Sequence, residues 1–188
     1  HMLELAYENV NQAFGQLLQF SDKIDEQIYK REDTVNYLDK VISEYISTAL
    51  ATPNLNVNIS QALSSYYLML VDIERISDYA VNMNHQATKR LQGDMTISEI
   101  EIVEHMKKLC VDMKNDLSDV EEAERKDDVI DSLVSSWREA QIQALKQQKC
   151  SSEVSMMLSR IFTDFERIND HALNVSQEFD KINIEIPE

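Results

Sequence analysis

Two pairs of carboxylates lie one helical turn apart in two copies of the same short motif. Segments 72–83, DIERISDYAVNM, and 164–175, DFERINDHALNV, carry identical residues at seven of twelve positions. Residues i and i+4 lie on one face of a helix, so each copy directs two anions the same way. The two pairs are Glu74 with Asp78 and Glu166 with Asp170. Adjacent carboxylates repel each other unless protons or cations neutralise them, so the motif is a candidate for cation binding.

A second set of acidic residues precedes each motif. Asp127 and Asp131 are again four residues apart, with Asp128 beside them, and Glu32 and Asp33 hold the corresponding place in the first half. If antiparallel packing brings each set against its motif, four or more carboxylates converge. Oxygen-rich sites suit hard cations such as magnesium, and carboxylate bridges also hold iron, zinc or manganese. The candidate metal ligands are Glu166, Asp170, Asp127, Asp131, Glu74, Asp78 and Glu32.

A solvated acidic surface is the competing interpretation, since acidic pairs at this spacing are common on strongly negative helices. The duplication brings the two interpretations to about equal weight. His171, which replaces Tyr79 of the first copy, is either a ligand or, as we favour, a surface or supporting histidine. His85 and His105 have no second histidine at ligand spacing, so we expect them to be exposed.

Composition indicates an all-α fold and argues against several functions. Among 188 residues there are only two glycines and two prolines, so few residues can interrupt helices. A net charge of −16 argues against nucleic-acid binding and favours cations or basic partner surfaces. Neither a nucleophile with an oriented base nor a glycine-rich phosphate loop is recognisable, so we expect no enzyme. A metal-dependent hydrolase is the interpretation with least support.

Apolar spacing and turn signals predict six helices in two tandem antiparallel three-helix bundles related by internal duplication. We expect helices over 3–20, 22–51 and 58–91, then two opened by the capping boxes Thr96 with Glu99 and Ser118 with Glu121, and a sixth from Glu153. Residues 1–2 are interpreted as a cloning remnant, 3–92 as the first repeat, 93–181 as the second and 182–188 as a frayed tail.

At the duplicated motif the sequence resembles PhoU, the phosphate-uptake regulator family, whose members have two three-helix bundles and a repeated motif similar to ERIGDHA. Ser77 and Asn169 stand where the family often has glycine. The resemblance implies metal clusters on paired carboxylates, with Glu74, Asp78, Glu166, Asp170, Asp127 and Asp131 at the matching positions. Glu32 departs from the pattern, because Asn36 follows it where the family has an aspartate. The second half is therefore the preferred metal site.

The resemblance implies a non-enzymatic regulatory domain for phosphate transport. Similar domains form the C-terminal, cytoplasmic part of bacterial sodium/phosphate cotransporters, and we favour that version because Leu3 enters a helix directly. The expected partner is a phosphate transporter membrane domain or a transport or signalling complex at the cytoplasmic face of the membrane, and a homo-oligomer is open. The alternative is a metal-independent module that docks on a membrane transporter or a signalling kinase.

Overall fold

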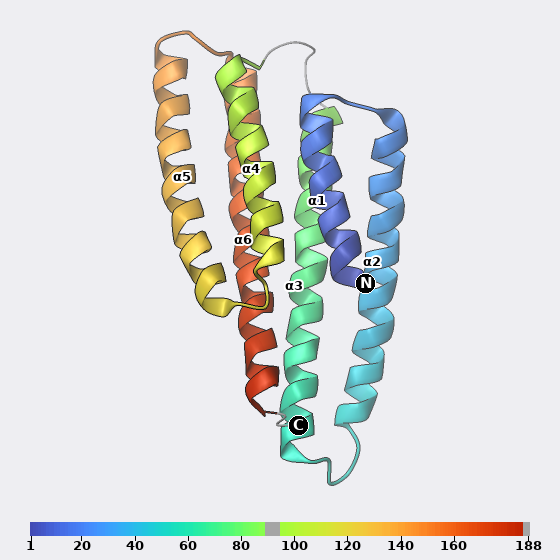
Figure 1. Ribbon diagram of the computed structural model, residues 1–188. Coiled ribbons are helices and arrows are strands. Elements are labelled where there is room, and N and C mark those ends of the chain that lie inside the picture. The colour runs from blue at the N-terminus through green and yellow to red at the C-terminus, as the bar shows by residue number, and fades with distance from the viewer. Residues whose placement is uncertain (89–94, 186–188) are drawn as a thin grey trace.

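The computed structural model of the chain describes residues 1–88 and 95–185, and over these residues it consists of six helices and no strands (Figure 1). The helices are α1 (Met2–Leu18), α2 (Asp22–Leu50), α3 (Val57–Thr88), α4 (Ile97–Asn115), α5 (Val120–Lys146) and α6 (Ser152–Glu185). The predicted all-α class is therefore confirmed.

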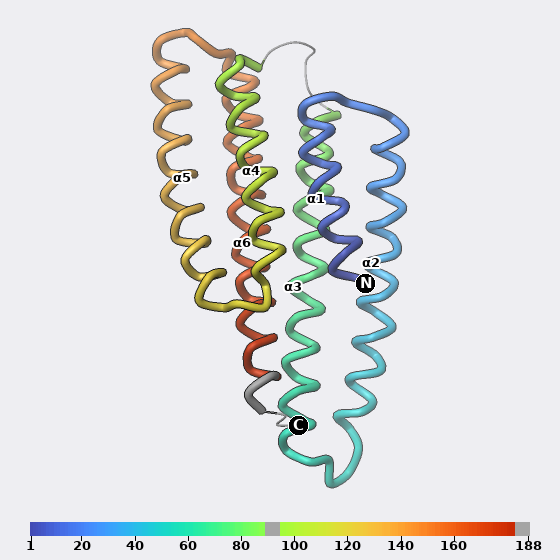
Figure 2. Tube along the Cα trace, viewed as in Figure 1, coloured from blue at the N-terminus to red at the C-terminus, as the bar shows by residue number. Residues whose placement is uncertain are grey.

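The helices form two antiparallel three-helix bundles that lie side by side, α1 to α3 in one and α4 to α6 in the other (Figure 2). The long helices α3 and α6 run antiparallel at the centre and make the most extensive contact in the molecule. α2 and α5 lie on the outside, and α1 contacts α4. Both copies of the motif thus lie on the central helices, each between its own bundle and the other half.

One hydrophobic core runs through both bundles. The rings of Phe14 on α1 and Phe165 on α6 meet edge to face with centroids 6.4 Å apart, and both side chains are fully buried. Trp137 on α5 packs against Phe162 and Phe165, at 6.2 Å and 6.3 Å between centroids. Such aromatic pairs add to the stabilisation from buried area. The two halves therefore share a core, and a smaller separate cluster that includes Val35, Ile46 and Leu70 packs α2 within the first bundle.

The helix starts confirm one of the two predicted capping boxes and correct the other. Thr96 caps α4 as predicted: its hydroxyl accepts a hydrogen bond from the Glu99 backbone at 3.3 Å, while Glu99 accepts one from the Thr96 backbone at 2.7 Å. The capping box predicted at Ser118 is wrong, because Asp119 is the cap of α5 and accepts from the Glu122 backbone at 3.1 Å. A carboxylate at this position accepts from the same free donors more strongly than a serine hydroxyl does.

The turn between α1 and α2 explains why α1 ends earlier than predicted. Ser21 precedes α2, but its side chain makes no capping hydrogen bond. Its backbone N–H instead donates to Gln16 Oε1 at 2.7 Å, and Gln16 Nε2 donates to the Ser21 carbonyl at 3.0 Å. Gln16 is buried, so this pair of hydrogen bonds fixes the turn from inside.

Both ends of the described chain are helical. Met2 is part of α1 and is buried, and Ile182 is buried on α6, which continues to Glu185. Ile182 packs with Met69 and Val175. Residues 89–94 lie outside the described residues. The predicted end of the third helix at residue 91 and most of the predicted repeat boundary at 92–95 fall within this range. No helix in the described part of the chain is long and apolar enough to cross a bilayer.

Candidate functional site

The first acidic face lies between α2 and α3. Glu32 on α2 is only 8% exposed and lies close to Glu74 and Asp78 of the first motif copy. Its Oε2 accepts a hydrogen bond from the Ser77 hydroxyl, and its Oε1 is buried with no hydrogen-bond partner among the described residues. A buried polar oxygen without a partner costs free energy, so this atom calls for a proton or a cation.

Two carboxyl groups of this face, Glu32 and Glu74, have raised pKa values. Burial is the main cause that raises the pKa of Glu32 to about 7. The Ser77 hydrogen bond opposes the rise, while the charge of Asp78, a hydrogen bond shared with the Asp78 carboxyl group when one of the two is protonated, and the charge of Glu74 add to it. Burial and the charge of Asp78 also raise the pKa of Glu74. Anions in a poorly solvated place favour the protonated form unless positive charge is supplied.

A buried polar chain fixes the position of Glu32. Ser77 is fully buried, and its hydroxyl accepts a hydrogen bond from Asn9 Nδ2 at 3.1 Å while donating to Glu32. Asn9 in turn accepts from Arg31 Nε at 2.8 Å. The Ser77 hydroxyl therefore ties α1 and α2 to the motif.

The second acidic face lies between α5 and α6. Burial, followed by the charges of Asp131, Asp170 and Asp128, raises the pKa of Asp127 to about 6. Asp127 Oδ1 is buried and unpartnered among the described residues, as Glu32 Oε1 is. Asn169, which replaces Ser77 in this copy, donates to the Phe165 carbonyl of its own helix at 2.7 Å.

Glu166 has a different neighbour from its counterpart Glu74. Arg138 on α5 donates to Glu166 Oε2 at 2.5 Å. In the first copy, Arg75 lies 3.7 Å from Glu74 and 3.3 Å from Asp78, and Arg167 lies 3.2 Å from Asp170 in the second. The motif arginines thus partly neutralise their own helix in both halves, as expected for i, i+3 pairs, and Arg138 is an addition of the second half.

Antiparallel packing brings together six of the seven candidate ligands in two groups. Glu32, Glu74 and Asp78 form one, Asp127, Asp131 and Asp170 form the other, and Glu166 is engaged by Arg138. Asp33 is exposed, although it was expected on the first face. Over the residues that the structure describes, no three His, Cys, Asp or Glu side chains already have the spacing of a metal-ligand set. The buried, unpartnered oxygens of Glu32 and Asp127 nonetheless fit a group that carries positive charge.

Three residues at these faces were missed from the sequence. Asp39 lies near enough to Glu74 to help raise its pKa, and Ser77 and Arg138 bond to site carboxylates. Asp39 follows Glu32 by seven residues and Arg138 follows Asp131 by seven, which is two helical turns on the same face. A search for polar residues at that spacing would have found both.

Three further polar residues of the motif, Asp72, His171 and Asn174, serve the contact between the halves. His171 Nδ1 lies 2.7 Å from Asp72 Oδ1, and Asn174 Nδ2 donates to the same oxygen at 3.1 Å. The His171 ring stacks on Tyr79, with centroids 5.7 Å apart. His171 therefore supports the interface from a half-buried position, in keeping with the role we favoured.

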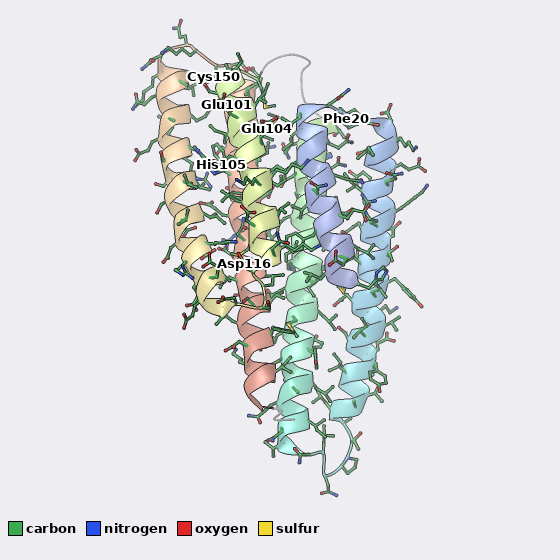
Figure 3. The ribbon with its side chains drawn as sticks, viewed as in Figure 1. Phe20, Glu101, Glu104, His105, Asp116 and Cys150 are labelled. Atoms are coloured by element: carbon green, nitrogen blue, oxygen red, sulfur yellow. The ribbon has the colours of Figure 1, made fainter. Side chains whose placement is uncertain are left out.

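Two histidines and both cysteines lie outside the two acidic faces. His85 is exposed, and His105 is an exposed residue of α4 whose ring contacts Trp137 at 5.4 Å (Figure 3). Cys110 is buried and Cys150 lies at the turn between α5 and α6, and both thiols are free. Lys126 of α5 pairs with Asp116 at the end of α4, which closes the hairpin between these helices.

Comparison with known proteins agrees with this architecture. The PhoU domain family matches residues 1–87 and 97–179. The phosphate-specific transport system accessory protein PhoU homolog 1 of Thermotoga maritima is 24% identical over 189 residues, which cover 94% of this chain and 80% of that protein.

Two solved structures share the fold. The crystal structure of PhoU from Pseudomonas aeruginosa has a TM-score of 0.84 at 21% identity and covers 98% of this chain and 93% of its own. The phosphate transport system regulatory protein PhoU from Streptococcus pneumoniae has a TM-score of 0.79 at 19% identity, with 97% and 91% covered. With a family match over both helical bundles and the same six-helix arrangement, the chain belongs to the PhoU family.

Proposed function

We propose that this protein is a non-enzymatic regulator of phosphate transport that binds a divalent or trivalent metal ion on its acidic helix faces and acts on an attached or partner transporter. Support for the transport role comes from the relatives: one is named an accessory protein of a phosphate-specific transport system, another a phosphate transport system regulatory protein. Family membership of nearly the whole chain supports the same role.

Buried carboxylate oxygens without partners carry the metal part of the proposal. Glu32 Oε1 and Asp127 Oδ1 each lie among further carboxylates that raise the pKa of their group. Bound iron, zinc, manganese or magnesium would supply the positive charge that these atoms lack. The candidate ligands are Glu32, Glu74 and Asp78 on the first face and Asp127, Asp131 and Asp170 on the second.

The transporter is the proposed recipient of the signal. In this proposal the protein works at the cytoplasmic face of the membrane, either as the C-terminal domain of a sodium/phosphate cotransporter or as a subunit bound to a separate transport or signalling complex. Metal occupancy would alter the charge that the acidic faces present to that partner, and complementary charge mainly sets specificity and association rate.

Metal analysis of the full chain tests the proposal. We expect protein purified without chelator to contain metal and to melt at a lower temperature after chelation, because a ligand selective for the folded state stabilises it. Glu32→Gln with Asp78→Asn should reduce both effects. A matched control pair, Asp33→Asn with Glu44→Gln, changes exposed carboxylates of α2 and should leave them unchanged. A metal-free protein whose melting temperature ignores added manganese, zinc, iron or magnesium would sink the proposal.

Metal-independent docking is the second candidate function. The observation in its favour is the net charge of −16, which suits basic loops of a membrane transporter or a signalling kinase. Glu32→Gln with Asp78→Asn separates the two candidates. Loss of partner binding at full metal content, with binding that weakens steeply with salt, would favour docking; loss of metal with intact partner binding would favour the first proposal.

A further inference from the structure

Arg138 is held on the second motif helix by several contacts at once. Its Nη2 donates to Glu166 Oε2 at 2.5 Å and to Thr163 Oγ1 at 3.2 Å, and its Nη1 donates to the Ser159 carbonyl at 3.4 Å. Its guanidinium carbon lies 5.7 Å from the centre of the Phe162 ring. These groups all belong to α6, so the charge of Arg138 is fixed beside Glu166.

The first half has no cation at the equivalent position. When Glu32 is aligned with Asp127, the place of Arg138 is taken by Ser43, whose hydroxyl donates to Asp39 Oδ1 at 3.4 Å. Ser43 therefore brings no positive charge to the first face. The motif arginines Arg75 and Arg167 occur in both halves and do not account for a difference between the faces.

A guanidinium and a metal ion compete for the same carboxylate. Arginine stays charged at all ordinary pH values and binds carboxylate oxygens through a planar set of donors. A metal ion that takes Glu166 as a ligand must first displace the Arg138 guanidinium. The positive charge of Arg138 then stays near the ion, because Thr163 and Ser159 of α6 also accept hydrogen bonds from it, and the two positive charges repel each other. Both faces have a buried, unpartnered oxygen, Glu32 Oε1 on the first and Asp127 Oδ1 on the second. On the first face, Glu32 is nine-tenths buried, and among the described residues Glu74 and Asp78 pair with Arg75 of their own helix and with no cation of α2.

We infer that Arg138 is a built-in counter-ion that keeps metal off the second acidic face, so that the ion binds on the first face at Glu32, Glu74 and Asp78. The inference rests on the metal-binding function proposed above. It reverses the preference drawn from sequence, where Asn36 counted against the first half and Arg138 was not considered. Asn36 has no carboxylate, but Asp39, two helical turns after Glu32, brings a further carboxylate close to Glu74 on the first face.

A reciprocal exchange of the two aligned residues provides the experiment. Full-length wild type, Arg138→Ser and Ser43→Arg are stripped with chelator, dialysed against manganese or zinc, and measured for bound metal per chain and for melting temperature. We expect Arg138→Ser to about double the bound metal and Ser43→Arg to lose most of it. Arg138→Gln keeps a donor for Thr163 without the charge and should behave like Arg138→Ser, which separates loss of charge from loss of packing.

Paired neutral variants show where the wild-type ion sits. Glu32→Gln with Asp78→Asn should abolish wild-type metal binding, whereas Asp127→Asn with Asp170→Asn should leave it intact. The inference is overturned if the second pair abolishes binding and the first does not, or if folded Arg138→Ser and Arg138→Gln bind no more metal than wild type. Wild type that binds no metal overturns the proposed function instead, whatever the Arg138 variants do.

Discussion

Asp72 and His171 meet across the boundary between the two bundles, with His171 Nδ1 2.7 Å from Asp72 Oδ1. Both residues belong to the duplicated motif, Asp72 at the start of the first copy and His171 near the middle of the second. Asn174 donates to the same Asp72 oxygen. Some polar residues of the motif therefore form the contact between the two halves and are not part of the acidic faces.

Removing the Asp72 carboxylate should weaken the whole fold. Asp72→Ala leaves the half-buried His171 without its partner, while the exposed Asn174 can bond to water, so the loss should be about 0.5–1.5 kcal/mol, as for a typical hydrogen bond. Urea denaturation measures the loss. Asp33→Ala removes an exposed carboxylate from α2 and should change the free energy of unfolding far less. Equal effects of the two substitutions would contradict a structural role for the Asp72 contact.

The start of α5 can be tested with neighbouring residues. Asp119→Ala removes the side chain that accepts from the Glu122 backbone and should cost about 0.5–2 kcal/mol of stability. Ser118→Ala should cost little, because Ser118 precedes the cap. Thermal unfolding of both variants decides between them, and a larger loss at Ser118 would restore the capping box predicted from the sequence.

Stability should fall as pH rises through the range in which Glu32 ionises. The ordinary pKa of 4.5 is raised to about 7 in the fold, chiefly by burial, so the folded state holds this proton more tightly than the unfolded chain does. The contribution of Glu32 to the free energy of unfolding is therefore fully present below about pH 4.5 and is lost progressively until about pH 7. Asp127 and Asp164, whose pKa values burial raises to about 6, add to the lower part of the decline.

Glu32→Gln isolates the contribution of Glu32 to this decline. The variant has no proton to lose, so relative to wild type it should gain stability between pH 5 and pH 8 in the presence of chelator. Urea denaturation at the two pH values gives the difference. Glu44→Gln, an exposed substitution on the same helix, should run parallel to wild type; a Glu32→Gln curve that does the same would refute the buried carboxyl as a source of the pH dependence.

The two halves should unfold together. Phe165 is fully buried, contacts Phe14 of the other bundle and Trp137 of its own, and belongs to one core that spans both. Trp137 is the single tryptophan, so its fluorescence reports on the second half while far-UV circular dichroism reports on all helices. We expect coincident transitions. Phe165→Ala should shift both by about 3–5 kcal/mol; separate midpoints in wild type would show independent halves.

Local features of the fold could be predicted from the sequence because they depend on neighbours along the chain. Helical apolar spacing, the scarcity of glycine and proline, and the Thr96–Glu99 capping box each act within a few residues. The i, i+4 spacing also placed Glu74 with Asp78 correctly on one face. The one-residue error at Ser118 arose because two adjacent residues both have capping side chains and both are followed by a glutamate at the right distance.

Contacts between helices could not be predicted in the same way. Whether Arg138 reaches Glu166 depends on the rotation of α5 against α6 and on the rotamer of a long side chain. The Asp72–His171 contact depends on the register of α3 against α6, which the shared core sets. The sequence therefore predicts which carboxylates share a helix face. The residues of other helices that contact them, such as Arg138, follow only from the packing of the helices.

The stacking of Tyr79 on His171 places equivalent positions of the two copies against each other. Such self-contact is the mark of an isologous interface, in which one surface patch meets its own copy across a two-fold axis. In a homodimer each substitution there would change both sides of the interface together. In a single chain that contains both copies, each side of the interface is encoded separately and can change alone. One acidic face can therefore have an arginine, Arg138, where the other has a serine, Ser43, so that two related faces become unequal.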